Sequence, residues 1–168
     1  MTRCPFCSAT HGAPQYSTRD TYGEEFEVLK CPGCRSYYLS PQPTEAELQK
    51  AYSSSYYGEG EQKFRGLIQR GIHYFIARRA RQLSRLTGFR PKVLDIGCGS
   101  GFFLQSMIKA ANARAYGIEL PGKSAERAAT VEGLQLKIGR LEAGDFKEDS
   151  FDLVTLFHVF EHLPNPAE

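Results

Sequence analysis

No apolar run in this 168-residue sequence approaches the roughly 18 residues that a membrane-spanning helix needs. The first residues, Met1 to Cys7, lack the basic-then-apolar pattern of a signal peptide. Internal repeats and low-complexity segments are also absent. The composition, with 41% hydrophobic and 24% charged residues, is that of an ordinary globular protein. We therefore expect a cytoplasmic protein without a membrane partner.

The formal net charge is only +2, which is too small by itself to imply a nucleic-acid partner. The charge is unevenly distributed, because the segment 63–92 holds nine basic residues and no acidic one. These residues are Lys63, Arg65, Arg70, Arg78, Arg79, Arg81, Arg85, Arg90 and Lys92. The segment could bind RNA phosphates or be a solvated helix face. We favour the solvated face, because we expect no aromatic residues interleaved on a common exposed face.

Four of the five cysteines form two close pairs, Cys4 with Cys7 and Cys31 with Cys34. Two residues separate the members of each pair, and a hairpin between the pairs would let four thiolates converge on one zinc ion. Such a closed tetrahedral site leaves no position for a substrate, so the zinc would be structural. Disulfides or free structural cysteines are the alternative, because the 23 residues between the pairs slightly exceed the usual spacing. We expect Cys98 to take no part.

The amino-terminal half reads as a small module followed by helices. Strands at 15–19 and 25–30 would form a hairpin around Gly23, and Thr44 with Glu47 makes a capping box that opens a helix through Tyr52. Apolar residues at helical spacing predict one long helix over 61–87. We therefore expect three parts: a zinc-ribbon module at 1–43, a helical linker and lid region at 44–90, and the amino-terminal part of a cofactor domain at 91–168.

The last part alternates strands with helices. Strands are expected at 92–96, 114–119, 134–138 and 151–157, with helices from Gly101 and around 124–131. This alternation predicts an α/β fold with a doubly wound, Rossmann-like parallel sheet, incomplete in this chain and preceded by the ribbon and a linking helix. Ligands of such sheets bind at the carboxyl ends of the strands.

A glycine-rich turn follows the first strand of this part. Gly97, Gly99 and Gly101 allow positive φ angles and a close approach of a ligand to the main chain, at the start of a helix. Glu119 ends the next strand, 22 positions after Gly97, where a carboxylate can accept hydrogen bonds from two ribose hydroxyls. A dinucleotide loop would need its third glycine at position 102, which is Phe102, so NAD and FAD are disfavoured.

Asp95 with this glycine spacing, Glu119, and the run Ser150 to Pro166 together resemble class I S-adenosylmethionine-dependent methyltransferases. The resemblance implies that Asp95 anchors the loop and the methionine amino group, and that the three glycines cradle the methionine end. It also implies that Glu119 holds the ribose and that residues 140–142 flank the adenine, with Leu141 as the apolar wall. Phe157 would lie against the cofactor as well.

His158 directly follows the fourth strand, so topology places it near the transferred methyl group as a candidate general base. His158, Glu161 and His162 could share one helical face and hold a divalent ion, although a local hydrogen-bonding role is the more common one. The cysteine pairs, the 40–44 link and the Tyr56, Tyr57 loop resemble bacterial methyltransferases that carry such a ribbon, which implies a small-molecule or sugar acceptor. The alternatives are an RNA methyltransferase that uses segment 63–92, and a non-catalytic interaction module with a cofactor-binding remnant.

Asn165 to Glu168 has the pattern of the first turn of a further helix. Only four strands can be counted, whereas the family resembled has seven. We expect a fragment truncated after the fourth strand that transfers no methyl group alone, with an unpaired apolar edge on that strand.

Overall fold

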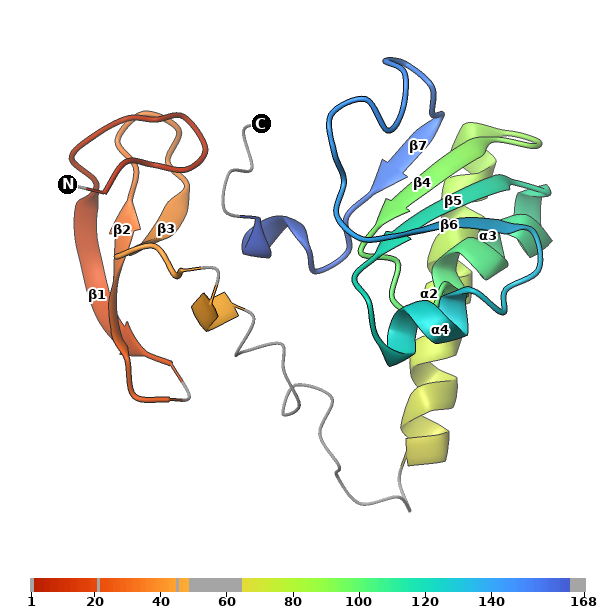
Figure 1. Cartoon of the computed structure of the whole chain (residues 1–168), viewed down its shortest axis with the longest axis horizontal. Helices are drawn as coiled ribbons and strands as arrows, with labels where there is room; N and C mark the ends of the chain where they lie inside the picture. The colour runs from red at the N-terminus through yellow and green to blue at the C-terminus, as the bar shows by residue number, and fades with distance from the viewer. Residues whose placement is uncertain (1, 21, 45, 49–64, 164–168) are drawn as a thin grey trace. The chain divides into compact units, whose positions relative to one another are not determined.

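The computed structural model describes residues 2–20, 22–44, 46–48 and 65–163. The chain forms two compact units, residues 1–60 with 161–168 and residues 61–160, here called the cysteine unit and the α/β unit (Figure 1). The expected turn at 165–168 and the tyrosines of the lid region lie outside the described residues. In the part of the chain that is described, no helix has the length and apolar character needed to cross a membrane.

The cysteine unit is a three-stranded antiparallel sheet in the order β1 (Ala13–Arg19), β2 (Glu25–Lys30), β3 (Tyr37–Ser40). The expected hairpin is confirmed, and its turn is held by the Asp20 carboxylate, which accepts the N–H groups of Tyr22 and Glu24 at 2.8 and 2.9 Å. Sequence analysis missed β3, because its four residues show almost no alternation. The capping box is confirmed, since Thr44 N–H donates to Glu47 and Glu47 N–H donates to Thr44 Oγ1.

The α/β unit contains a parallel sheet in the order β6-β5-β4-β7. Three strands lie where they were expected: β4 (Lys92–Ile96), β5 (Arg114–Glu119) and β6 (Leu134–Ile138). The fourth, β7 (Leu153–Thr155), is shorter than the expected 151–157, because residues 157–159 turn away from the sheet. This α/β parallel sheet confirms the fold class. Among the described strands β7 pairs with β4 alone, and Val154 on this edge is 47% exposed.

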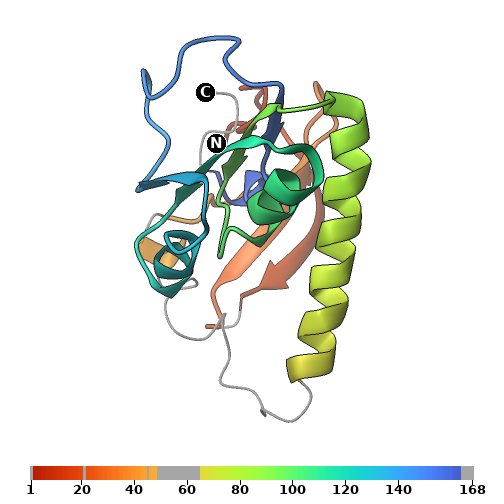
Figure 2. The same cartoon turned by 90° about the vertical axis from the view of Figure 1, so that its right-hand side faces the viewer.

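Helices α2 (Arg65–Thr87) and α3 (Phe102–Ala111) lie side by side in the α/β unit (Figure 2). Ala80 of α2 is fully buried, and Ile76 and Leu83 pack against the same core. The helix expected in the linker therefore belongs to the α/β unit. A further short helix of this unit is α4 (Lys123–Ala128), and the 3-10 turn η1 (Phe160–His162) begins at the last residue of the unit.

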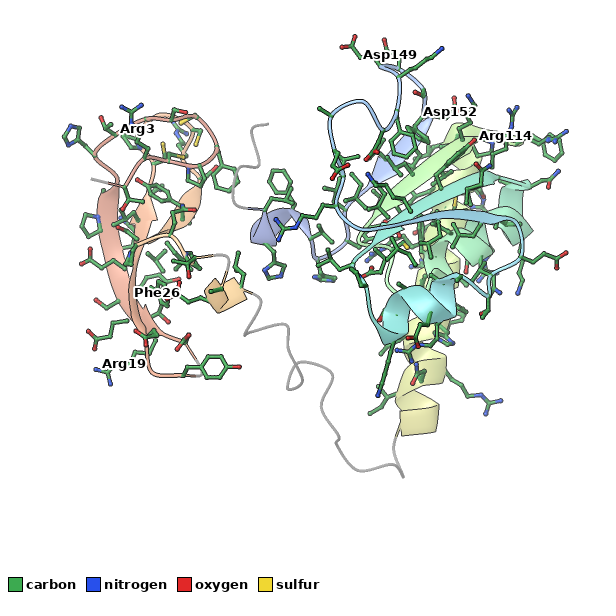
Figure 3. All side chains as sticks on the ribbon, viewed as in Figure 1. Arg3, Arg19, Phe26, Arg114, Asp149 and Asp152 are labelled. Carbon is green, nitrogen blue, oxygen red and sulfur yellow. The ribbon has the colours of Figure 1, made fainter. Side chains whose placement is uncertain are left out.

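The strand order reverses between β4 and β7, because the chain runs outward from β4 to β6 and then returns to the other side of β4. Such a switch point opens a ligand crevice at the carboxyl ends of the two strands. In Figure 3, the labelled residues Arg114 and Asp152 mark the opposite edge, where the strands begin. The carboxyl edge is thus where a ligand site is expected.

Candidate cofactor site and cysteine cluster

The glycine loop leaves the end of β4 in a fixed conformation. The N–H groups of Gly97 and Cys98 both donate to the Ile118 carbonyl, at 2.8 and 3.0 Å. A Cβ at Gly97 would lie 2.3 Å from a methyl group of Val159, so this position has no room for a side chain. Gly99 differs, because its φ is +57° and, its chain neighbours apart, no atom of the described residues lies within 4 Å of the place of a Cβ. The loop is therefore open at Gly99, which allows a ligand to approach its main chain.

Helix α3 begins directly after the loop. Its N-cap is Gly101 in the left-handed conformation, which offers no side-chain hydrogen bond to the first turn. The first N–H groups of α3 consequently keep their capacity to bind a ligand carboxylate.

Glu119 ends β5 and reaches the same loop. Its Oε2 accepts the Gly99 N–H at 2.6 Å, and its second oxygen has no hydrogen-bond partner among the described residues. Glu119 lies level with Ile138 of β6, at the carboxyl edge of the sheet. The structure therefore brings the predicted glycine loop and the predicted ribose-binding carboxylate together, with one oxygen left for a ligand.

Asp95 lies in β4, only 3% exposed, and its Oδ1 accepts a hydrogen bond from the Thr155 hydroxyl at 2.7 Å. Burial raises the pKa of Asp95 to about 7, the Thr155 bond acts in the opposite direction, and the Glu119 carboxylate raises it further. Sequence analysis missed Thr155. The signal for it was a hydroxyl in an otherwise apolar strand, whose register opposite Asp95 only the sheet order reveals.

The remaining predicted residues follow β6 and β7. Leu141 is 48% exposed, in a turn where Lys137 Nζ lies 2.6 Å from the Asp145 carboxylate. The ring of Phe157 packs edge-on against Phe103, with centroids 5.0 Å apart. The guanidinium of Arg79 lies 4.7 Å from the Phe157 centroid, which is a cation–π contact that sequence analysis did not foresee.

His158 is exposed, three residues beyond β7, and its backbone has a φ of +57°. It therefore lies at the carboxyl edge, where the topology placed it. The suggested divalent-ion group of His158, Glu161 and His162 depends on the Glu161 side chain, which is outside the described part of the chain. Among the described residues, the one group with metal-ligand geometry is the cysteine cluster.

The cysteine cluster is built from two turns of the same design. In the first turn Ser8 N–H donates to the Cys4 carbonyl, and in the second Arg35 N–H donates to the Cys31 carbonyl, at 2.9 and 3.1 Å. Ser8 and Arg35 both have left-handed backbones, with φ of 59° and 64°. The sulfur atoms gather at one end of the three-stranded sheet, near the labelled Arg3 (Figure 3).

The four sulfurs of Cys4, Cys7, Cys31 and Cys34 lie within 4.8 Å of one another. The pairs Cys4–Cys34 and Cys7–Cys31 are 3.6 and 3.4 Å apart, and all of these cysteines are free. Four thiolates around zinc at about 2.3 Å would be about 3.8 Å apart, so the spacing suits one tetrahedral ion. Burial raises the pKa of Cys4 to about 11, so this thiolate needs a cation beside it to persist at neutral pH.

The outer face of α2 carries a row of arginines. Arg78, Arg81 and Arg85 line one surface hollow together with Tyr74 and Gln82. In the described part of the chain, none of these arginines lies within ion-pair distance of a carboxylate. Tyr74 is 59% exposed, so one aromatic side chain shares this face with the arginines, although the aromatic and basic residues do not alternate along the hollow.

A parallel sheet with a glycine loop and an acidic residue at its carboxyl edge defines the class of nucleoside-binding α/β domains. Within this class, residues 62–168 match the family described as methyltransferase domain, over more than half of the chain. The chain therefore belongs to the methyltransferase domain family, in its class I, S-adenosylmethionine-dependent form.

Two curated relatives are ubiquinone biosynthesis O-methyltransferases. The protein from Neisseria meningitidis serogroup C is 34% identical over 83 residues, which cover 45% of this chain and 35% of the relative. The protein from Pasteurella multocida is 31% identical over 103 residues, covering 52% and 41%. The match thus spans about two fifths or less of the length of these relatives. A solved structure that resembles this chain is that of the plantazolicin methyltransferase BpumL, crystallised with S-adenosylhomocysteine (SAH). It is 19% identical to this chain, with a TM-score of 0.49, and the match covers 58% of this chain and 41% of that chain.

Proposed function

We propose that the protein transfers a methyl group from S-adenosylmethionine to a small-molecule or sugar-type acceptor. One observation carries the cofactor assignment. At the carboxyl edge of a parallel sheet, the Gly99 N–H of the open glycine loop donates a hydrogen bond of 2.6 Å to Glu119 Oε2. A small-molecule acceptor is supported by the names of the curated relatives, which are O-methyltransferases of ubiquinone biosynthesis.

Different residues of this chain would bind the methionine, ribose and adenine parts of the cofactor. The first N–H groups of α3 would bind the carboxylate of the methionine part, and Asp95 would favour its cationic amino group. The free oxygen of Glu119 accepts a ribose hydroxyl, and Leu141 offers an apolar surface to the adenine. The cofactor supplies an electrophilic methyl group on a sulfonium. Transfer of this methyl group would require the acceptor oxygen to lie in line with the breaking carbon–sulfur bond, so catalysis would rest on positioning.

His158 is our candidate for the base that takes the proton from the acceptor oxygen as the new carbon–oxygen bond forms. Its exposed position just beyond β7 supports this role. A positioned base contributes about 10²- to 10⁴-fold to a rate. We expect His158→Ala to lower kcat by about that factor while the Kd for S-adenosylhomocysteine stays within about twofold. A variant with unchanged kcat would remove His158 from the mechanism.

Glu119→Ala should weaken the binding of S-adenosylhomocysteine about 10- to 100-fold, because a hydrogen bond to a carboxylate contributes about 1.5–3 kcal/mol. Calorimetry with S-adenosylhomocysteine and with NAD measures both the loss and the selectivity. Glu126→Ala is the matched control, since Glu126 is an exposed glutamate on α4 in the same unit.

Equal affinity for NAD and S-adenosylhomocysteine would contradict the cofactor assignment. An unchanged Kd in Glu119→Ala would contradict the ribose contact. Glu119→Gln separates the two tasks of this residue, because the amide oxygen can still accept the Gly99 N–H while the charge is lost.

The cysteine cluster is proposed to hold one structural zinc ion. Four thiolates complete a tetrahedral shell, so the ion has no open position for catalysis. Its role is to close the cysteine unit, whose buried core consists of Cys4, Leu29, Cys31 and Tyr38.

RNA is the second candidate acceptor, favoured by the row of Tyr74 with Arg78, Arg81 and Arg85. Titration with RNA at several salt concentrations distinguishes it from a small molecule. Affinity that falls steeply with salt, and that falls further in Arg78→Gln, would favour RNA. Binding no tighter than that of another weakly basic protein would leave the small-molecule acceptor.

A further inference from the structure

Asp95 and Thr155 form a buried polar pair on the two strands that flank the switch point. Apart from cysteines and Tyr38, they are the buried polar side chains of the described residues. They are register partners on β4 and β7, and the Thr155 hydroxyl lies 2.7 Å from Asp95 Oδ1. The Leu94 carbonyl lies at 3.4 Å from the same hydroxyl. A hydroxyl has one proton to donate, and the shorter contact to the acid is the stronger one.

The Glu119 carboxylate at the end of β5 disfavours the ionised form of Asp95. The Cys98 thiol after β4 has its own pKa raised, mainly by burial, to about 12, so it brings no charge near neutral pH. No lysine, arginine or histidine forms an ion pair with Asp95 among the described residues. The Thr155 hydroxyl is therefore the side-chain donor that favours the Asp95 carboxylate in the ligand-free protein.

This pair also connects the two halves of the crevice. Asp95 lies two residues before Gly97, the first glycine of the loop, and Thr155 lies two residues before Phe157, which starts the turn that carries His158. Val159 of the same turn fills the space above Gly97. The hydrogen bond between β4 and β7 thus holds together the strand ends from which the glycine loop and the turn at 157–159 begin.

We propose that Thr155 is a positioning residue whose hydroxyl holds the Asp95 carboxylate ionised and oriented toward the crevice, where it receives the cationic end of the ligand. The ligand part of this inference rests on the proposed function. The action of Thr155 on Asp95 does not, because it belongs to the ligand-free protein.

The test compares Thr155→Val, which keeps the shape and removes the donor, with Thr155→Ser, which keeps the donor. The carboxyl resonance of Asp95, followed by NMR against pH in the ligand-free protein, reports its ionisation. Loss of the donor in Thr155→Val should raise the pKa of Asp95, whereas Thr155→Ser should leave it close to that of the wild type. Unfolding curves of both variants check that they fold.

Calorimetry with S-adenosylhomocysteine is the second measurement. At pH 7 we expect roughly fivefold weaker binding to Thr155→Val, because a smaller fraction of Asp95 is then ionised. At pH 9 the difference should shrink to within about twofold, and a purely structural role would not produce that recovery.

An unchanged Asp95 titration in Thr155→Val overturns the inference, whatever the affinity. Weaker binding in Thr155→Val that is equal at both pH values also overturns it. If the titration shifts but the wild-type protein binds no S-adenosylhomocysteine, the proposed function fails while the action of Thr155 on Asp95 is upheld.

Discussion

Protein purified without a chelator is expected to contain about one zinc ion per chain, and Cys31→Ser is expected to lose it together with the fold of the cysteine unit. The four sulfurs already lie within 4.8 Å of one another, at a spacing that suits a tetrahedral ion. Zinc bound to four such ligands contributes on the order of 10 kcal/mol to small metal-dependent folds. The cysteine unit has a core of only a few residues, so it depends on that contribution.

The loss should stay within the cysteine unit. The cores of the two units share no residue, since the α/β core consists of side chains from α2, the sheet, α3, α4 and the loops that connect them. Atomic emission gives the zinc content, and NMR resonances of Leu29 and Leu104 report the two cores separately. In Cys31→Ser, we expect the resonances of the cysteine unit to collapse to the narrow chemical-shift range of an unfolded chain. The Leu104 resonances should keep their native positions.

Cys98→Ser is the control for this experiment. Cys98 is buried in the α/β core and is not among the four converging sulfurs, so its replacement should leave the zinc content unchanged. Less than half an equivalent of zinc in the wild type, or a folded cysteine unit in Cys31→Ser, would contradict the zinc site.

The parts of the fold that sequence predicts well are those that local chemistry decides. The strands at 92–96, 114–119 and 134–138 each contain buried or half-buried apolar residues and have Gly or Pro within two residues of at least one end, so apolar runs and breakers help to mark them. The strand β3 and the end of β7 depend instead on pairing with a neighbour, and β7 stops where Phe157 turns back to pack on Phe103. Tertiary contacts of this kind leave little trace in a local pattern.

The site divides in the same way. Gly97, Gly99 and Glu119 were predictable, because backbone freedom and a carboxylate at a strand end have a recognisable spacing. Thr155 and Arg79 were not, since each acts on a residue more than 55 positions away along the chain, on Asp95 or on Phe157. Only the order β4-β7 and the packing of α2 bring these partners together.

The second large effect is expected for Asp95→Asn, which should stabilise the ligand-free protein at pH 8 while weakening cofactor binding at least about tenfold. Asp95 is almost fully buried and its pKa is raised to about 7, mainly by burial. An acid whose pKa is higher in the folded than in the unfolded state contributes stability that is fully present below the unfolded value of about 3.9. This contribution is lost as the pH rises through about 7.

At pH 8 the wild-type protein therefore bears the cost of a buried carboxylate, on the order of a few kcal/mol, that asparagine avoids. At pH 5 the folded-state acid is protonated and nearly the same shape as the amide, so the difference in unfolding midpoint between the two proteins should be clearly smaller than at pH 8, and it should vanish only below the unfolded pKa of about 3.9. Denaturant unfolding at pH 5 and pH 8 measures this difference. Glu148→Gln, at an exposed position of the same unit, is the control for a simple change of net charge.

The reason for retaining an acid here would be binding rather than stability. A neutral amide attracts a cationic amino group much less strongly than a carboxylate does. The low polarity around Asp95 increases this difference in attraction. Asparagine should therefore reduce the affinity for S-adenosylhomocysteine and remove its dependence on pH near 7. If Asp95→Asn destabilises the protein at pH 8, the raised pKa of Asp95 is wrong. If it is stabilised but binds as tightly as the wild type, Asp95 does not face the cationic end of the cofactor.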